Sequence, residues 1–339
     1  EAGAINAGWL GKLYAKGRRS RDPAQVISGD FEADVILDGD HLPAGKAALY
    51  YAGIAGSVPG GLWDIGGGAG RLWIGGDVGS VGDGGAVTMW TARMASLVSL
   101  TLGNVHGGDV EVDDALRSVK ALRWANGRLE ADSIGALSVT GGKGVGAVSG
   151  DFGADVTVNG TGVAENAFAV GKVAVSGDLA NSDWKVGGNV RSFVTAGTAR
   201  GSSLRSSGGI SAIDLGATSA SDFLAGVDVL STSRRAETDG DFVNGGGAIG
   251  SVNIRGVGPS GSTERFFEDS NLSAVSFGSI RLKNIDFDTG QSGFRASNGG
   301  EAPAFGSVSY ADTETGQTWS WKSANTEPIP APSGFFQTV

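Results

Sequence analysis

A short pattern of apolar and small residues recurs along most of the chain. An apolar residue is followed by a small residue, one variable residue, and then two apolar residues with one residue between them. Clear copies begin at Ile134, Val170, Ile249, Phe277 and Phe305, and looser copies begin at Ala69, Met94, Leu116, Val190 and Ile210. Recurrence at about 20 residues is typical of a solenoid, because each unit buries its apolar face against its neighbours.

A second pattern accompanies most copies of the first. A small or polar pair precedes residues that alternate between apolar and polar, which predicts a short strand with its apolar side inward. Examples lie at 109–112, 128–131, 183–186, 203–206, 271–274 and 293–296. Each coil therefore contains at least two short strands, separated by corners rich in Gly, Ser, Asn and Asp.

The spacing of the first pattern indicates which kind of solenoid forms. Its copies lie 18 to 39 residues apart. The 36 residues from Ile134 to Val170 split into two coils of 18 if Phe152 begins another copy. The 39 residues from Ile210 to Ile249 contain a further, degenerate coil around 227–230 if the repeat is unbroken. This gives about 11 or 12 coils. A left-handed β-helix needs 18 residues in every coil, so a right-handed or irregular one is favoured.

The predicted fold is all-β: a single parallel β-helix with an N-terminal cap and an extended C-terminal tail. We divide it into a cap with first irregular coils at 1–64, the solenoid at 65–310, and a terminal strand with tail at 311–339. Residues 2–16 are the best candidate for a helix or irregular cap, which would protect the open edge of the first coil. Two charged stretches, 231–241 and 258–269, are predicted excursions from the coil. In the tail, prolines after 327 predict a projecting arm.

Composition limits the function classes. The 60 glycines suit many tight corners, and the absence of cysteine excludes disulfides and thiolate chemistry. A net charge of -10 argues against a nucleic-acid partner, and no apolar run is long enough to span a membrane. The one basic run, at 16–21, is interpreted as a solvated face.

The Gly-containing copies of the pattern that begin at Ile249 and Phe277, with their charged excursions, resemble the repeat regions of large bacterial exported proteins. These include autotransporter-like passenger domains and the secreted repeat proteins of planctomycete-type bacteria. The resemblance covers about residues 65–310 and is one of repeat style. It implies an extracellular or cell-surface location and a role as an adhesin, surface-layer or matrix component, with no shared active site. The segment at 329–332 also resembles the start of a C-terminal surface-sorting signal.

Right-handed β-helices also include polysaccharide lyases and hydrolases, so we searched for clustered carboxylates. Asp109, Glu111 and Asp113 share one side of an alternating strand and are weak candidates for a calcium patch; a solvated face is the alternative. No other cofactor is indicated. His106 lies in a Gly-rich corner, and with no catalytic motif present, no catalytic residue is assigned.

Aromatic residues are the candidates for partner contact. Trp73 lies between Leu72 and Ile74, so it points outward wherever those two point inward. Trp319 and Trp321 alternate with polar residues in the tail, and Phe266 and Phe267 lie in a charged excursion. Outward aromatic side chains are frequent at contact surfaces.

The expected function is that of a non-catalytic extracellular structural or surface protein of bacteria. It would act through its sheet faces and ends and form homo-oligomers or filaments when the tail strand at 317–321 pairs with the next copy. The alternative is a polysaccharide-active or polysaccharide-binding β-helix, with a cell-surface polysaccharide as partner.

Overall fold

The computed structural model describes residues 3–17, 28–144, 147–243, 247–258, 264–285, 287, 292–297, 303–325, 328–332 and 334–339. Its internal contacts divide the chain into two compact units, 1–157 and 158–339. The boundary lies inside the stretch 65–310, which the sequence predicted to be one solenoid. Each unit is therefore described by itself.

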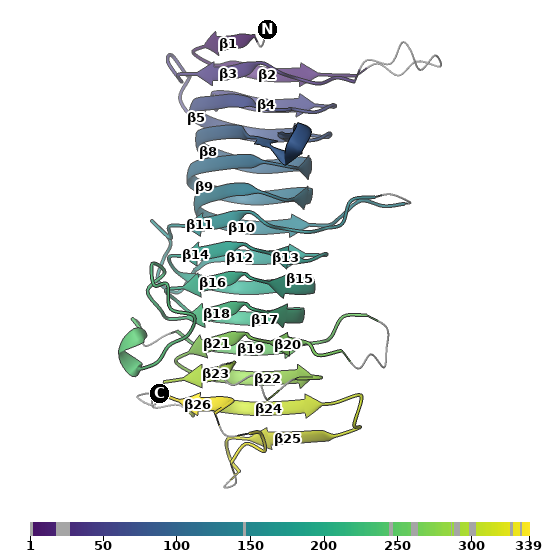
Figure 1. Cartoon of the computed structure of the whole chain (residues 1–339). Helices are drawn as coiled ribbons and strands as arrows, with labels where there is room; N and C mark the ends of the chain where they lie inside the picture. The colour runs from purple at the N-terminus through teal and green to yellow at the C-terminus, as the bar shows by residue number, and fades with distance from the viewer. Residues whose placement is uncertain are drawn as a thin grey trace. The chain divides into compact units, whose positions relative to one another are not determined.

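Unit 1 is built almost wholly from parallel strands, stacked one above the next in the purple to teal part of Figure 1. Its elements are β1 (Ala4–Ala7), β2 (Leu10–Ala15), β3 (Asp34–Leu37), β4 (Leu49–Ile54), β5 (Gly61–Ile74), β6 (Ser80–Val81), η2 (Asp83–Gly85), β7 (Val87–Thr88), β8 (Trp90–Val105), β9 (Gly108–Trp124) and β10 (Gly127–Val139). Strand β11 (Asp155–Val158) contains the boundary between the units.

Unit 2 repeats this construction with shorter strands and longer excursions. Its elements are β12 (Phe168–Val175), β13 (Leu179–Ala180), β14 (Asp183–Val186), β15 (Asn189–Arg200), β16 (Ser203–Ser206), β17 (Ile210–Ser219), β18 (Asp222–Ala225), η3 (Asp239–Asp241), β19 (Ile249–Ile254), β20 (Phe267–Glu268), β21 (Asn271–Ala274), β22 (Phe277–Lys283), β23 (Gly293–Ala296), β24 (Phe305–Ala311), β25 (Thr318–Lys322) and β26 (Phe336–Thr338).

We call each copy of the first sequence pattern a phrase. The first residues of successive phrases form a buried column along the inside of each unit. In unit 1 the parallel register aligns Leu49, Ala69, Leu97, Leu116 and Ile134. In unit 2 it aligns Val190, Ile210, Ile249, Phe277 and Phe305. Coil-on-coil alignment of the same repeat position defines a parallel β-solenoid, so the predicted fold class is confirmed.

The small residue of the phrase is needed because successive coils come close at this corner. A Cβ on Gly250 would lie 2.6 Å from the backbone oxygen of Ser211. A Cβ on Gly278 would overlap the oxygen of Gly250, and one on Gly306 would overlap the oxygen of Gly278. The glycines thus stack in a column where only a hydrogen atom fits.

Large aromatic side chains fill the interior. The rings of Trp63 and Trp90 meet edge to face at 5.6 Å between centroids in unit 1, and both are fully buried. In unit 2, Phe193 contacts Trp184 at 5.1 Å and Phe223 at 6.1 Å. Ring pairs of this kind stabilise the core beyond the effect of burial alone.

Of the two alternatives predicted for 2–16, a helix or an irregular cap, the helix is wrong. The described residues of this segment form β1 and β2, which pair in parallel with β3 and β4. Leu10 and Leu13 align with Leu49 and Ala52, so the apolar spacing that suggested a helix is the spacing of the repeated phrase. Gly8 and Gly11, which disfavour a helix, fit this corner.

Three details of the repeat also differ from prediction. Leu97, rather than Met94, occupies the column position in β8. Phe152 forms an isolated bridge with Trp124 and so does not begin a phrase. Ile210 pairs directly with Ile249, so the described residues of 226–248 form one long excursion and no hidden coil.

The C-terminal tail does not project as an arm. Strand β25 turns back and pairs antiparallel with β24, and β26 pairs in parallel with β23 (Figure 1). The alternation at Trp319 and Trp321 did predict a strand, but Phe335 and Phe336 return the end of the chain to the aromatic core, where Phe336 stacks on Phe294 at 5.2 Å. Full burial of Phe335 and partial burial of Phe336 favour the folded-back tail.

Candidate functional site

The candidate calcium residues lie on a surface of alternating charge in unit 1. Glu111 pairs with Arg93, with 3.5 Å between Oε2 and Nε, and Asp109 aligns with Arg128 on the next coil. Arg128 itself bonds Glu130. Asp113, at the exposed corner that follows, is not part of this ladder.

No metal-binding cluster forms around those carboxylates. In the part of the chain that the structure describes, no group of three or more His, Asp or Glu side chains is arranged to hold a metal ion. Glu130 aligns with Glu111, but Arg93 and Arg128 pair with these two carboxylates, so the described side chains do not favour the predicted calcium patch. His106 lies in a corner as predicted, with its Nε2 2.9 Å from Asn104 Nδ2 and 3.7 Å from Asp77 Oδ2.

Two of the predicted contact residues belong to the core. Phe266 and Phe267 are buried, and Phe267 stacks on Phe294 with 5.6 Å between ring centroids. The charged neighbours of this pair suggested an exposed excursion, but Phe267 lies in β20, which pairs with β17. Their interpretation as surface contact residues is therefore wrong.

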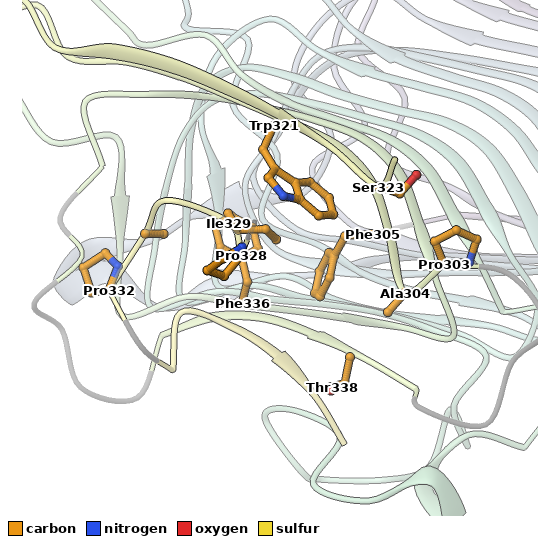
Figure 2. A pocket seen from close by; sticks show the side chains of 11 residues that line it. Pro303, Ala304, Phe305, Trp321, Ser323, Pro328, Ile329, Pro332, Phe336 and Thr338 are labelled. Carbon is orange, nitrogen blue, oxygen red and sulfur yellow. The ribbon is translucent and has the colours of Figure 1, made fainter. Parts of the chain in front are cut away.

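Trp319 and Trp321 turn toward their own chain. Trp319 packs on Tyr310 at 5.5 Å, and both tryptophans are partly exposed. Figure 2 shows Trp321 beside Phe305, Ile329 and Pro328 in an apolar groove of about 560 Å³. The proline-containing end of the tail forms one side of this groove, so the two tryptophans have intrachain contacts in place of a free outer face.

Trp73 points outward as predicted, with 40% of its surface exposed. The structure adds neighbours that the sequence did not identify. Tyr14 is 52% exposed, and its ring centroid lies 5.2 Å from that of Tyr51 on the next coil. The parallel register aligns Tyr14, Gly53 and Trp73 across β2, β4 and β5. We call the outer side of these three strands the aromatic face.

Cations accompany these rings. Lys12 and Arg71 are exposed and align with Tyr51 from the coils on either side. Lys16 Nζ lies 5.1 Å from the centroid of the Tyr14 ring, a cation–π contact. Among the described residues, none of these three cations has a carboxylate oxygen within 4.0 Å. The segments 9–16, 49–55 and 69–75 contain no Asp or Glu, although the whole chain has a net charge of -10.

Sequence reasoning missed most of this face because it assigned 2–16 to a helix or cap. A usable signal was present. An aromatic residue precedes a glycine by two positions at Tyr51 and Trp73, with glycine at 53 and 75, whereas Tyr14 has no such glycine. Residues two apart share one side of a strand, so each pair lies on the same surface.

Both ends of the described chain present strand edges. Among the described residues, β1 pairs only with β3, β2 only with β4, and β25 only with β24. Gly3 and Ala7 direct their carbonyl groups to β3, accepting from Asp34 and Asp38. Because alternate residues of a strand face opposite edges, the N–H of Asn6 faces the open edge.

The edge of β25 follows the same rule. Gln317 accepts from the N–H of Asp312, and the N–H of Ser323 donates to Gly306, so both face β24. Ser320 lies an odd number of residues from each, which directs its N–H away from β24. Exposed edges of this kind are templates for pairing with another strand.

A buried carboxylate organises the turn between β24 and β25. Burial raises the pKa of Asp312, but the N–H groups of Thr315 and Glu314, the Tyr310 hydroxyl and the Arg265 guanidinium outweigh it and lower that pKa to about 2. The hydroxyl of Tyr310 donates to Asp312 at 3.0 Å, and Arg265 lies 3.2 Å away. Burial, with the nearby carboxylate second, raises the pKa of Tyr310 to about 12. All these groups serve one turn, which indicates a structural role.

No protein-family model, curated protein or solved structure matches this chain. Among the described residues, no helix is long and apolar enough to cross a membrane.

Proposed function

We propose that this chain is a non-catalytic structural protein of the bacterial cell surface or extracellular matrix, and that copies associate by strand pairing at open edges. The repeat-style resemblance to exported bacterial proteins supports an extracellular location. The solenoid supports a scaffold role, since its extended sheets and edges are suited to contact.

The observation that carries the proposal is the pair of strand edges that have no partner among the described residues, β1 with β2 in unit 1 and β25 in unit 2. Natural sheets usually protect their edges with proline, a bulge or a covering segment. Here Asn6 and Ser320 face outward from regular strands, and both are exposed. Strand β25 already pairs within its own chain, so its second edge, rather than a released tail, provides the contact.

Proline substitution tests this directly. Asn6→Pro and Ser320→Pro each remove an N–H that faces away from the chain's own sheet, so intrachain pairing is retained while strand addition is blocked. Asn6→Ala and Ser320→Ala are the matched controls. Light scattering and electron microscopy over a range of protein concentrations should show oligomers or filaments for the parent and both alanine variants.

At least one proline variant should need an about tenfold higher concentration for the same degree of association. Circular dichroism must first show that the proline variants keep the strand signal of the parent. A parent chain that remains monomeric at every concentration, or folded proline variants that associate as the parent does, would contradict the proposal.

A further inference from the structure

Three aromatic rings from successive coils lie side by side on the aromatic face. Tyr14 and Trp73 align with Gly53, one from each side, and are separated by the width of strand β4. The ring of Tyr51 fills this space, because it lies over Gly53 and 5.2 Å from Tyr14. The three rings therefore follow one another across β2, β4 and β5, with Tyr14 and Tyr51 in contact.

Glycines allow two of these rings to lie against the backbone. An ideal Cβ on Gly53 would be 2.6 Å from Tyr51 Cε1 and 3.0 Å from its Cζ, so the ring occupies the place of a side chain. An ideal Cβ on Gly75 would be 2.8 Å from Trp73 Cζ2. Each ring thus rests on the strand and presents its other side to solvent. A ring held in this way is a flat platform whose orientation is already fixed before binding.

The charge around the platform is positive. Lys12 and Arg71 flank Tyr51, Lys16 lies over Tyr14, and the three segments that form the face contain no carboxylate. A ligand of matching chemistry has apolar flat surfaces to stack on the rings and anionic groups for the lysines and arginine. Pyranose rings that carry carboxylates combine both properties.

We propose that the aromatic face binds an acidic polysaccharide, with Tyr51 and Trp73 stacked on sugar rings and Lys12 and Arg71 paired with uronate carboxylates. The chain's overall negative charge disfavours the dense phosphates of nucleic acid, whereas a uronate polymer has one charge on each sugar. The face is an open strip rather than a pocket, which suits a long polymer. This binding goes beyond the structural role and does not depend on self-association.

Affinity electrophoresis of the full chain in gels with dissolved polymer tests the ligand class. Polygalacturonate is the probe, and its methyl ester is the matched neutral polymer with the same sugar backbone. Poly-glutamate supplies carboxylates without sugars, and poly-deoxythymidine supplies bases and phosphates. Polygalacturonate should retard the protein at an about tenfold lower concentration than any of the other three polymers. Equal retardation by poly-glutamate or poly-deoxythymidine would overturn the proposal, as would no retardation by polygalacturonate.

Variants then test the face itself. Gly53→Ala tilts the Tyr51 ring without removing it, because the three atoms nearest to the new Cβ all belong to that side chain. It should weaken binding by about fivefold, and Lys12→Gln with Arg71→Gln by about tenfold. Phe168→Ala is the matched control: Phe168 is 39% exposed and contacts Arg191, but lies in unit 2 outside the face.

The thermal unfolding midpoint and oligomeric state of each variant are measured alongside binding. Weaker binding with both unchanged supports the face as the site. Unchanged binding of the Gly53→Ala and Lys12→Gln/Arg71→Gln variants, or an equal loss in Phe168→Ala, would overturn it. Loss of association without loss of binding would instead bear on the proposed function alone.

Discussion

Buried serines connect successive coils at one corner of unit 2. The hydroxyl oxygen of Ser202 accepts from the N–H of Ser182 at 3.2 Å, Ser221 accepts from Ser202 at 3.1 Å, and Ser270 accepts from Ser221 at 3.2 Å. All four are buried. Each hydroxyl therefore satisfies a backbone group that water cannot reach, which makes the corner stable only when the serine is present.

Ser221 allows a test of this ladder. Ser221→Ala leaves the N–H of Ser202 without its acceptor, whereas the carbonyl of Ser219, which loses the Ser221 hydroxyl, still accepts from the N–H of Gly201. Because the N–H of Ser202 is shielded from water, we expect the free energy of unfolding to fall by about 1–3 kcal/mol. Urea unfolding followed by circular dichroism measures it. Ser211→Ala, at an exposed position of β17, should change stability by less than about 0.5 kcal/mol, and equal effects of the two substitutions would contradict the argument.

At the scale of the strand, the glycine column determines how closely coils approach. Gly278→Ala in β22 places a methyl group against the backbone oxygen of Gly250, which cannot move without displacing β19. Overpacking against backbone should lower the free energy of unfolding by about 1–3 kcal/mol. In Gly240, of η3, the nearest atom to an added Cβ is Thr238 Oγ1 at 3.6 Å, so Gly240→Ala is the control. Thermal unfolding that does not distinguish the two variants would show that the close approach is unimportant.

The same column explains which elements could be predicted from sequence. Phrases with the glycine present, such as those at Ile249 and Phe277, were placed correctly because close coil contact imposes both the glycine and the apolar spacing. Residues 2–16 were misassigned because their apolar residues fit a helix as well as the corner of a coil. The long excursion at 226–248 and the returning β26 depend on contacts distant in sequence, which no local pattern encodes.

The aromatic face shows the same limit for the site. The outward direction of Trp73 followed from strand alternation alone. Its association with Tyr14 and Tyr51 required the register of β2, β4 and β5, which depends on coils of different length between them. The grouping of cations around this face is likewise visible only in three dimensions. Lys12 and Arg71 are 59 positions apart in sequence, yet they flank the ring of Tyr51.

For the molecule as a whole, 36 Asp and Glu residues oppose 26 Lys and Arg, so acid changes both net charge and specific contacts. Asp312 separates these effects, because its pKa in the folded chain is lowered to about 2 from the ordinary value of 3.8. A lowered pKa adds stability that is fully present above the ordinary value and is lost as pH falls through about 2.

Asp312→Asn should thus reduce the free energy of unfolding by about 2 kcal/mol at pH 6, and the difference from the parent should shrink as pH falls from about 5 to about 2. Denaturant unfolding at several pH values measures the difference, in which effects of net charge common to both proteins cancel. Asp83→Asn, at an exposed position of η2, should show no such shrinking gap. A difference in unfolding free energy between Asp312→Asn and the parent that stayed constant over this range would contradict the prediction. The turn between β24 and β25 would then not require the charge of Asp312, and the contacts of Tyr310 and Arg265 would stabilise the turn through packing alone.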